Sequence, residues 1–172
     1  MIRQSLKKWA GKTYRAYRKW RSQNAGILCY VRSSDAIRVL LARRVGSSRN
    51  RFFSGGGRWG GSGGGVNAGE SLWEAAIRET IEEFGDHPVL GRALQKFGGD
   101  VPMHWNAGFP LYHFEVFLLE LEEMPGQWPT PHAADGHEWD RFGWFSLKEL
   151  PRPLLPGLSS LERRLELLEA EK

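Results

Sequence analysis

The residues of this sequence best suited to chemistry are an arginine and three glutamates within six positions. Residues 78–83 read Arg-Glu-Thr-Ile-Glu-Glu. Residues three and four positions apart share a helix face, so a helix here places Glu79 beside both Glu82 and Glu83. Like charges at these spacings destabilise a helix by some tenths of a kcal/mol per pair. A bound cation would relieve that repulsion, and carboxylate oxygens are ligands that Mg²⁺ and Mn²⁺ prefer.

Arg78 precedes Glu82 by four residues and could hold one carboxylate in a fixed orientation. The alternative reading of this stretch is a solvated acidic helix face. Taken alone, the stretch favours that alternative.

A glycine-rich segment precedes the acidic helix. Residues 60–65 read Gly-Gly-Ser-Gly-Gly-Gly. Glycine adopts positive φ and lets the backbone approach a ligand closely. A carbonyl here could reach a metal, and the amides could reach a phosphate, so Gly63 and Gly64 are candidate substrate-binding residues. A flexible linker is the alternative, which a glycine run in isolation favours.

Taken together, these two segments resemble the Nudix box, G-x5-E-x7-R-E-U-x-E-E-x-G-U, where U is a bulky aliphatic residue. The seven fixed positions that fall in register are Gly64, Glu70, Arg78, Glu79, Glu82, Glu83 and Gly85. Thr80 and Asp86 depart from the pattern at aliphatic positions. Ser62 replaces the proline that usually precedes the paired glycines, and we expect this to leave the loop less stiff.

The resemblance implies roles for the matched residues. Glu79, Glu82 and Glu83 are expected to bind Mg²⁺, or Mn²⁺ in its place, together with the carbonyl group of Gly64. Arg78 is expected to orient the glutamates and to pair with Glu70. In this chemistry, metal ions offset the charge that builds up on a pyrophosphate during in-line attack, and they activate a water molecule.

The box does not identify the general base that accepts the proton of the water. Glu83 or a later loop glutamate could serve, and we favour Glu138. The predicted catalytic residues are therefore Glu83, Glu138 and Arg78. Glu115 is a competitor for the base, and its alternative reading is an exposed position on a strand with alternating apolar residues.

Aromatic residues on predicted loops are candidates for stacking on a nucleobase. They are Phe53, Trp59, Trp105 and Phe109. Of these, we take Phe53 and Trp59 as candidate substrate-binding residues, with simple packing as the alternative for each. The histidines at 104, 113, 132 and 137 show no metal-binding spacing and are interpreted as surface or packing residues.

Two classes of function follow from the resemblance. The first is a pyrophosphohydrolase that cleaves a nucleoside diphosphate linked to another moiety, such as a nucleoside triphosphate, a dinucleoside polyphosphate or a nucleotide sugar. The second is a non-catalytic Nudix-fold module that senses a nucleotide. The box keeps all of its metal-binding carboxylates, which favours catalysis.

The predicted elements alternate between strands and helices, which indicates an α/β fold. We expect strands at 27–31, 37–42, 89–94, 111–119 and 142–145, and a helical turn at 147–150. The acidic helix should span 71–84, with Ser71 and Glu74 as a capping box and Gly85 at its end. A last helix should start at about Ser159. The resemblance implies a Nudix-type α/β/α sandwich with a mixed sheet over 25–172.

Residues 1–24 form a separate basic arm in this prediction. They contain eight lysines and arginines and no acid, whereas the whole chain has a net charge of +4. Apolar residues recur every three or four positions, so we expect an amphipathic helix. It could bind an anionic surface such as RNA or lipid, could serve as a mitochondrial presequence, or could pack on the acidic body.

The remaining composition is that of an ordinary globular protein of 172 residues. The single cysteine, Cys29, excludes an internal disulfide and fits a reducing compartment. No apolar run approaches the roughly 18 residues of a membrane span. We therefore expect a cytoplasmic protein. The sequence does not give its oligomeric state.

Overall fold

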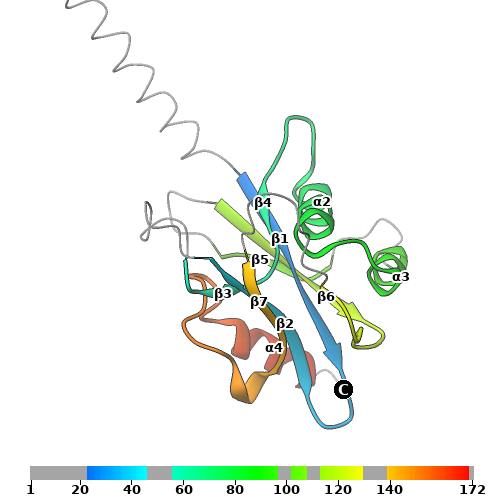
Figure 1. Cartoon of the computed structure of the whole chain (residues 1–172), viewed down its shortest axis with the longest axis vertical. Coiled ribbons are helices and arrows are strands. Elements are labelled where there is room, and N and C mark those ends of the chain that lie inside the picture. The colour runs from blue at the N-terminus through cyan, green and yellow to red at the C-terminus, as the bar shows by residue number, and fades with distance from the viewer. Residues whose placement is uncertain (1–22, 46–55, 97–101, 108–112, 130–138, 171–172) are drawn as a thin grey trace, which may run out of the picture.

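A mixed β-sheet forms the middle layer of the molecule (Figure 1). The computed structural model describes residues 23–45, 56–96, 102–107, 113–129 and 139–170. The strands are β1 (Gln23–Arg32), β2 (Ile37–Arg44), β3 (Trp59–Gly60), β4 (Gly64–Gly65), β5 (His104–Asn106), β6 (His113–Leu121) and β7 (Trp139–Ser146). Their order is β3-β2-β1-β6-β5, with β4 also paired to β1 and β7 to β2. Among the strands that the structure describes, β1 and β6 pair in parallel and the other pairs are antiparallel.

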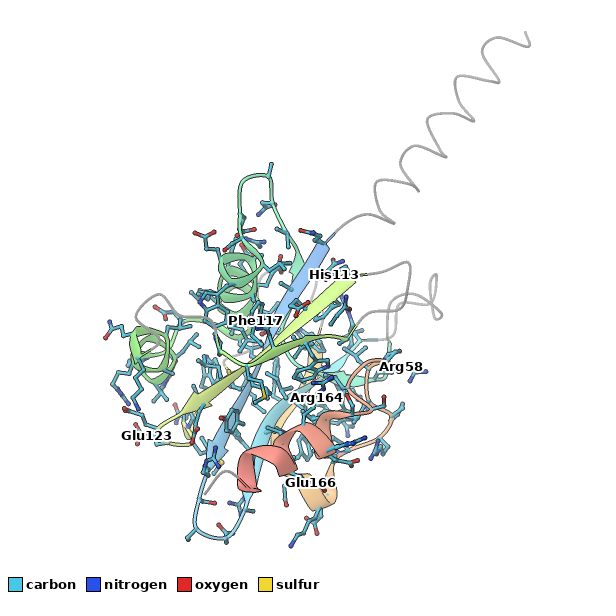
Figure 2. All side chains as sticks on the ribbon, turned by 180° about the vertical axis from the view of Figure 1, so that it is seen from behind. Arg58, His113, Phe117, Glu123, Arg164 and Glu166 are labelled. Carbon is cyan, nitrogen blue, oxygen red and sulfur yellow. The ribbon has the colours of Figure 1, made fainter. Side chains whose placement is uncertain are left out.

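Helices cover both faces of this sheet. On one face lie α2 (Leu72–Phe84) and α3 (Pro88–Lys96). On the other lie the short 3-10 helix η1 (Leu147–Glu149) and α4 (Leu161–Ala170). Figure 2, seen from behind, shows α4 with Arg164 and Glu166 in front of the sheet. Two apolar cores result, one on each side of the sheet. This is the predicted α/β/α sandwich, and none of the described helices is long and apolar enough to cross a membrane.

The sequence placed most elements correctly but misjudged some of their limits. β1 begins at Gln23, so the last two residues assigned to the arm belong to the sheet, and residues 1–22 lie outside the described residues. β7 spans eight residues where four were predicted. α4 begins at Leu161, two residues later than predicted. Short strands β3, β4 and β5 form within segments predicted as loops.

The predicted strand at 89–94 is wrong, because these residues belong to helix α3. Val89, Leu90 and Ala93 are its buried residues, and their spacing is that of one helix face. Pro88 occupies the first helical position, where its missing N–H is not needed. A six-residue apolar window does not distinguish this pattern from a strand.

The glycine-rich segment fills a gap in the sheet. β1 and β2 pair directly only from Tyr30–Val39 to Arg32–Ile37. Beyond that point β3 pairs with β2 and β4 pairs with β1, so residues 59–65 lie between the two long strands. A Cβ atom on Gly26 would lie only 2.0 Å from the carbonyl oxygen of Ser62, and one on Gly61 2.5 Å from that of Ile27. The glycines are therefore packing residues, and the flexible-linker alternative is wrong.

We expect Gly26→Ala to lower the free energy of unfolding by about 1–3 kcal/mol, because the added methyl group overlaps backbone that cannot easily move. The matched control is Gly91→Ala in α3, where a Cβ meets nothing within 4 Å. That substitution should raise stability by about 0.5–1 kcal/mol through helix propensity. Urea unfolding of the two variants measures both effects. A neutral Gly26→Ala would show that the segment yields to the methyl group.

Candidate active site

Helix α2 presents the acidic residues, and local sequence defines both of its ends. The Oγ atom of Ser71 accepts the N–H of Glu74 at 3.2 Å, and the Glu74 carboxylate accepts the N–H of Ser71 at 2.8 Å. This is the predicted capping box, and the backbone hydrogen bond of Ser71 lowers the pKa of Glu74. Gly85 ends the helix at a φ of 83°. The buried residues Ala75, Ala76, Thr80 and Phe84 fix which face meets the sheet.

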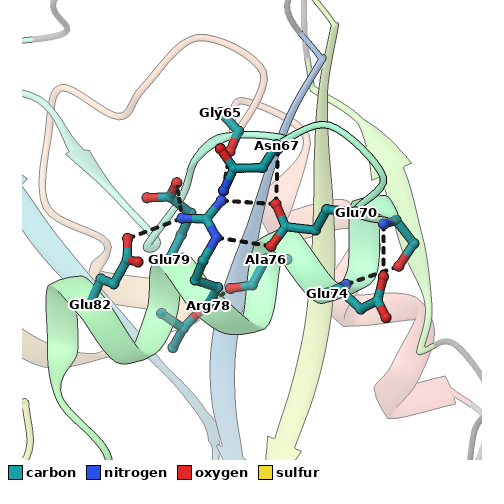
Figure 3. Close-up of polar contacts among 10 residues, drawn as sticks. Gly65, Asn67, Glu70, Glu74, Ala76, Arg78, Glu79 and Glu82 are labelled. Atoms are coloured by element: carbon teal, nitrogen blue, oxygen red, sulfur yellow. Dashed lines mark hydrogen bonds and ion pairs between the residues drawn. The ribbon is translucent and has the colours of Figure 1, made fainter.

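Arg78 is the centre of a hydrogen-bond network beside this helix (Figure 3). Its Nε and Nη2 atoms donate to the two oxygens of Glu70 at 2.8 and 3.1 Å, a bidentate pair. Its Nη1 atom donates to Glu79 at 2.7 Å and to Glu82 at 3.0 Å. Nη2 also donates to the carbonyl oxygen of Gly65 at 2.8 Å. The guanidinium therefore ties the glycine segment, the loop before α2 and the helix together.

The charge of this network shifts the titration of its members. The hydrogen bonds from Arg78, with a further one from the backbone N–H of Asn67, hold the pKa of Glu70 below its ordinary value of 4.5. The same carboxylates raise the pKa of Arg78 above its ordinary value, Glu70 having the largest effect. Arg78 consequently keeps its positive charge at neutral and mildly alkaline pH.

Two of the glutamates lie against the glycine backbone. The N–H of Gly63 donates to Glu83 Oε2 at 2.8 Å. The Glu79 carboxylate occupies the space where a side chain on Gly64 would stand, since a Cβ there would lie 2.4 Å from its carbon. Only glycine at position 64 lets this carboxylate and the backbone meet.

A cavity of about 330 Å³ opens at this point. It is lined by Asn24, Arg44, Gly63, Gly64, Gly65, Glu79, Glu83 and Phe114. These residues come from β1, β2, β4, β6 and α2, so the cavity lies where the strand ends and the helix meet. A second hollow, on the outer face of α2, has an apolar lining that includes Ile77 and Ile81. The cavity beside the glycine segment has the charged and backbone groups that chemistry needs.

The donor atoms at the cavity are of the kind that Mg²⁺ requires. Glu79 and Glu83 supply carboxylate oxygens, and the adjoining backbone supplies carbonyl groups. Glu82 is not among the lining residues, and its side chain is 57% exposed beside Arg78. Among the described residues, no three His, Cys, Asp or Glu side chains already converge as a metal cage. Arg78 uses one oxygen each of Glu79 and Glu82, so the other oxygens are the candidate ligands.

Comparison with known proteins identifies the family of this chain. The family model described as NUDIX domain matches residues 21–165. The chain belongs to the Nudix family. Membership, together with the seven fixed residues of the box, makes it a hydrolase of phosphoric anhydride bonds, a pyrophosphohydrolase in general terms.

Solved Nudix structures share the fold. An Ap4A hydrolase from C. elegans, in a binary complex, has 21% sequence identity and a TM-score of 0.62 over 87% of this chain and 100% of that chain. The M. smegmatis Nudix hydrolase RenU has 20% identity and a TM-score of 0.61 over 88% and 87% of the two chains. A MutT protein from Methanosarcina mazei Go1 has 22% identity and a TM-score of 0.59 over 88% and 96%. No curated protein matches the sequence.

The structure of this Nudix domain brings together part of the predicted site. Gly63, Gly64, Glu79 and Glu83 line the cavity. Arg78 pairs with Glu70 and holds two of the glutamates, as the box implies. Phe53, Phe109 and Glu138 lie outside the described residues, so their roles stay predictions.

The predicted aromatic contacts have no support among the described residues. Trp59 packs edge-on against Phe145 with ring centroids 5.1 Å apart and does not line the cavity, so its substrate contact stays a prediction. Trp105 is buried; its indole N–H donates to the carbonyl of Gly157, and the Arg164 guanidinium lies over its ring. The ring has a packing role.

The alternative reading of Glu115 as an exposed strand residue is wrong. It is buried, 8% exposed, and its carboxylate lies 3.1 Å from His113 and 3.7 Å from His104. Figure 2 shows His113 and Phe117 on the same strand, β6. Alternation predicted exposure because it assumes one solvated face, whereas helices cover both faces of this sheet. Glu115 is not among the residues that line the cavity.

Sequence reasoning missed Asn24, Arg44 and Phe114 as site residues. Asn24 was assigned to the arm, and Arg44 lies two residues beyond the predicted end of its strand. Phe114 lies within the strand predicted at 111–119 and was not singled out there. The run of two arginines at the end of β2 is a signal that could have indicated Arg44.

Glu70→Gln should lower stability at pH 7, and the difference from wild type should shrink as the pH falls below about 4.5. The pKa of Glu70 is depressed in the folded chain, so its contribution is present above the ordinary value of 4.5 and is lost on acidification. Urea midpoints between pH 7 and pH 3.5 measure this. Glu166→Gln, an exposed change on α4, is the control. A pH-independent difference would contradict the ion-pair account.

Proposed function

We propose that this Nudix hydrolase uses Mg²⁺, or Mn²⁺ in its place, to cleave a nucleoside diphosphate linked to another moiety. The candidates are a nucleoside triphosphate, a dinucleoside polyphosphate and a nucleotide sugar. The observation that carries the proposal is the cavity, where two carboxylates, a glycine backbone and an arginine meet. This combination suits a substrate with adjacent phosphates.

In this proposal, different residues at the cavity bind the metal ion and the substrate. Glu79 and Glu83 hold the cation, and Glu82 joins them from the Arg78 side. When bound, the cation offsets charge on the pyrophosphate oxygens and makes the attacking water more acidic. Among the residues that line the cavity, Arg44 has the positively charged side chain, and we assign it to contact a phosphate group of the substrate. Phe114 offers an aromatic surface beside it.

The general base remains a choice between Glu83 and Glu138. Glu83 lines the cavity and is oriented by the Gly63 amide. Glu138, which the sequence favours, lies outside the described residues and stays a prediction. The anionic partner predicted for residues 1–24, RNA or lipid, stays a prediction because residues 1–22 lie outside the described residues.

Incubation of the full chain with Mg²⁺ and a substrate panel tests the proposal. The panel contains nucleoside triphosphates, dinucleoside polyphosphates, ADP-ribose and 5′-triphosphate RNA. We expect turnover of at least one member and none after chelation of the metal. Glu83→Gln should lower kcat by about a hundredfold or more without unfolding the chain, whereas Glu166→Gln should not. Binding without turnover across the panel would instead favour the nucleotide-sensing module.

Arg44→Ala should raise KM about tenfold or more, because a charged hydrogen bond to a phosphate oxygen is lost. The matched control is Arg38→Ala, on the same strand, where Arg38 pairs with Asp35 away from the cavity. Arg44→Lys should recover part of the loss. Steady-state kinetics on the substrate found in the panel measures KM. An unchanged KM for Arg44→Ala would remove Arg44 from the phosphate-binding residues.

A further inference from the structure

Two departures from the box pattern contact each other in the structure. Ser62 Oγ and Thr80 Oγ1 are 2.6 Å apart, and both residues are buried, 1% and 0% exposed. Ser62 stands where a proline was expected, and Thr80 stands at an aliphatic position. The sequence alone predicted a loosened loop from the first change, whereas the structure links the two by a hydrogen bond.

Each of the two hydroxyls also faces a backbone carbonyl oxygen. Thr80 Oγ1 donates to the carbonyl oxygen of Ala76 at 2.7 Å, within its own helix. Each hydroxyl has one proton, so whichever hydroxyl donates across the 2.6 Å contact gives up its bond to a carbonyl oxygen. Ser62 Oγ also lies 3.2 Å from the carbonyl oxygen of Ile27. The pair therefore bridges β1, the glycine segment and α2.

The pair stands beside the residues that hold the cation. Three consecutive residues of the segment contact α2: Ser62 contacts Thr80, the Gly63 amide donates to Glu83, and Gly64 abuts Glu79. Ser62 and Thr80 are the members of this set with buried side chains, and the two carboxylates line the cavity. A shift of the segment along the helix would separate the carboxylates from the backbone.

We infer that the Ser62 and Thr80 hydroxyls form a positioning clamp, which fixes the glycine segment against α2 so that Glu79 and Glu83 bind a divalent cation together. The clamp replaces the stiffness that proline would give. Ser62 and Thr80 are positioning residues and do not touch the cation or the substrate. The inference rests on the proposed function, because it concerns the same metal site.

Binding of Mn²⁺ to the full chain tests the clamp without any substrate. The free cation is measured by electron paramagnetic resonance at neutral pH. Thr80→Val keeps the shape and removes the hydroxyl, and Ser62→Ala removes its partner. Each should raise the Kd for Mn²⁺ about tenfold, as loss of a group that orients a ligand does. The double variant should be no weaker than the weaker single variant, because the two changes break one interaction.

Two controls separate positioning from a general loss of stability. Thr80→Ser keeps a hydroxyl and should retain wild-type affinity. Val31→Ala removes atoms from the same core at the far end of β1 and should leave the Kd unchanged. Wild-type affinity in Thr80→Val, or an equal loss in Val31→Ala, would overturn the clamp alone. A wild-type chain that binds no Mn²⁺ at millimolar concentration would overturn the proposed function and the clamp together.

Discussion

Repulsion among carboxylates is the constraint around which this site is built. Glu70, Glu79 and Glu82 surround a single guanidinium, that of Arg78. Three acids and one base leave a net charge of −2 in the network, and Glu83 adds a further negative charge beside it. Such a concentration persists in a folded protein when a cation offsets it. The position of the helix, the run of glycines and the orientation of Arg78 all serve to hold these acids together.

The glycine segment brings its backbone groups close to the carboxylates of α2. β1 and β2 separate after three residue pairs, and the segment enters between them. Gly26 and Gly61 permit the close backbone contacts that hold it there, and Gly64 leaves room for Glu79. Residues with side chains at these positions would push the strands or the carboxylate away. Glycine residues therefore make this segment well packed, whereas in an open loop they would make the backbone more flexible.

Sequence reasoning succeeded where the signal was local. Spacing along one helix was enough to predict the capping box of Ser71 and Glu74 and the helix end at Gly85. It also predicted that Glu79, Glu82 and Glu83 lie near one another. The α/β/α architecture followed from the resemblance. Helix α3 was missed because a short apolar run carries too few periods to separate a helix from a strand.

Only half of the residues that line the cavity were predicted from the sequence, because the other half depends on the register of the strand pairing. Asn24, Arg44 and Phe114 meet there through strand pairings that no local pattern encodes. The burial of Glu115 likewise depends on helices packing on both faces. The Ser62–Thr80 contact joins residues 18 positions apart in different elements, so the sequence showed them only as two separate departures from the box pattern.

The parallel ladder between β1 and β6 has a consequence for how the protein acquires its site. Its pairs, from Gln23–His113 to Val31–Leu121, join residues 90 positions apart. Closing so long a loop carries an entropic penalty that contacts within one helix do not. The acidic helix can therefore form early, from its own sequence, while the hollow beside it exists only after the sixth strand has docked. During synthesis the acidic residues of α2 would therefore emerge before β6, the strand whose Phe114 completes the lining of the hollow.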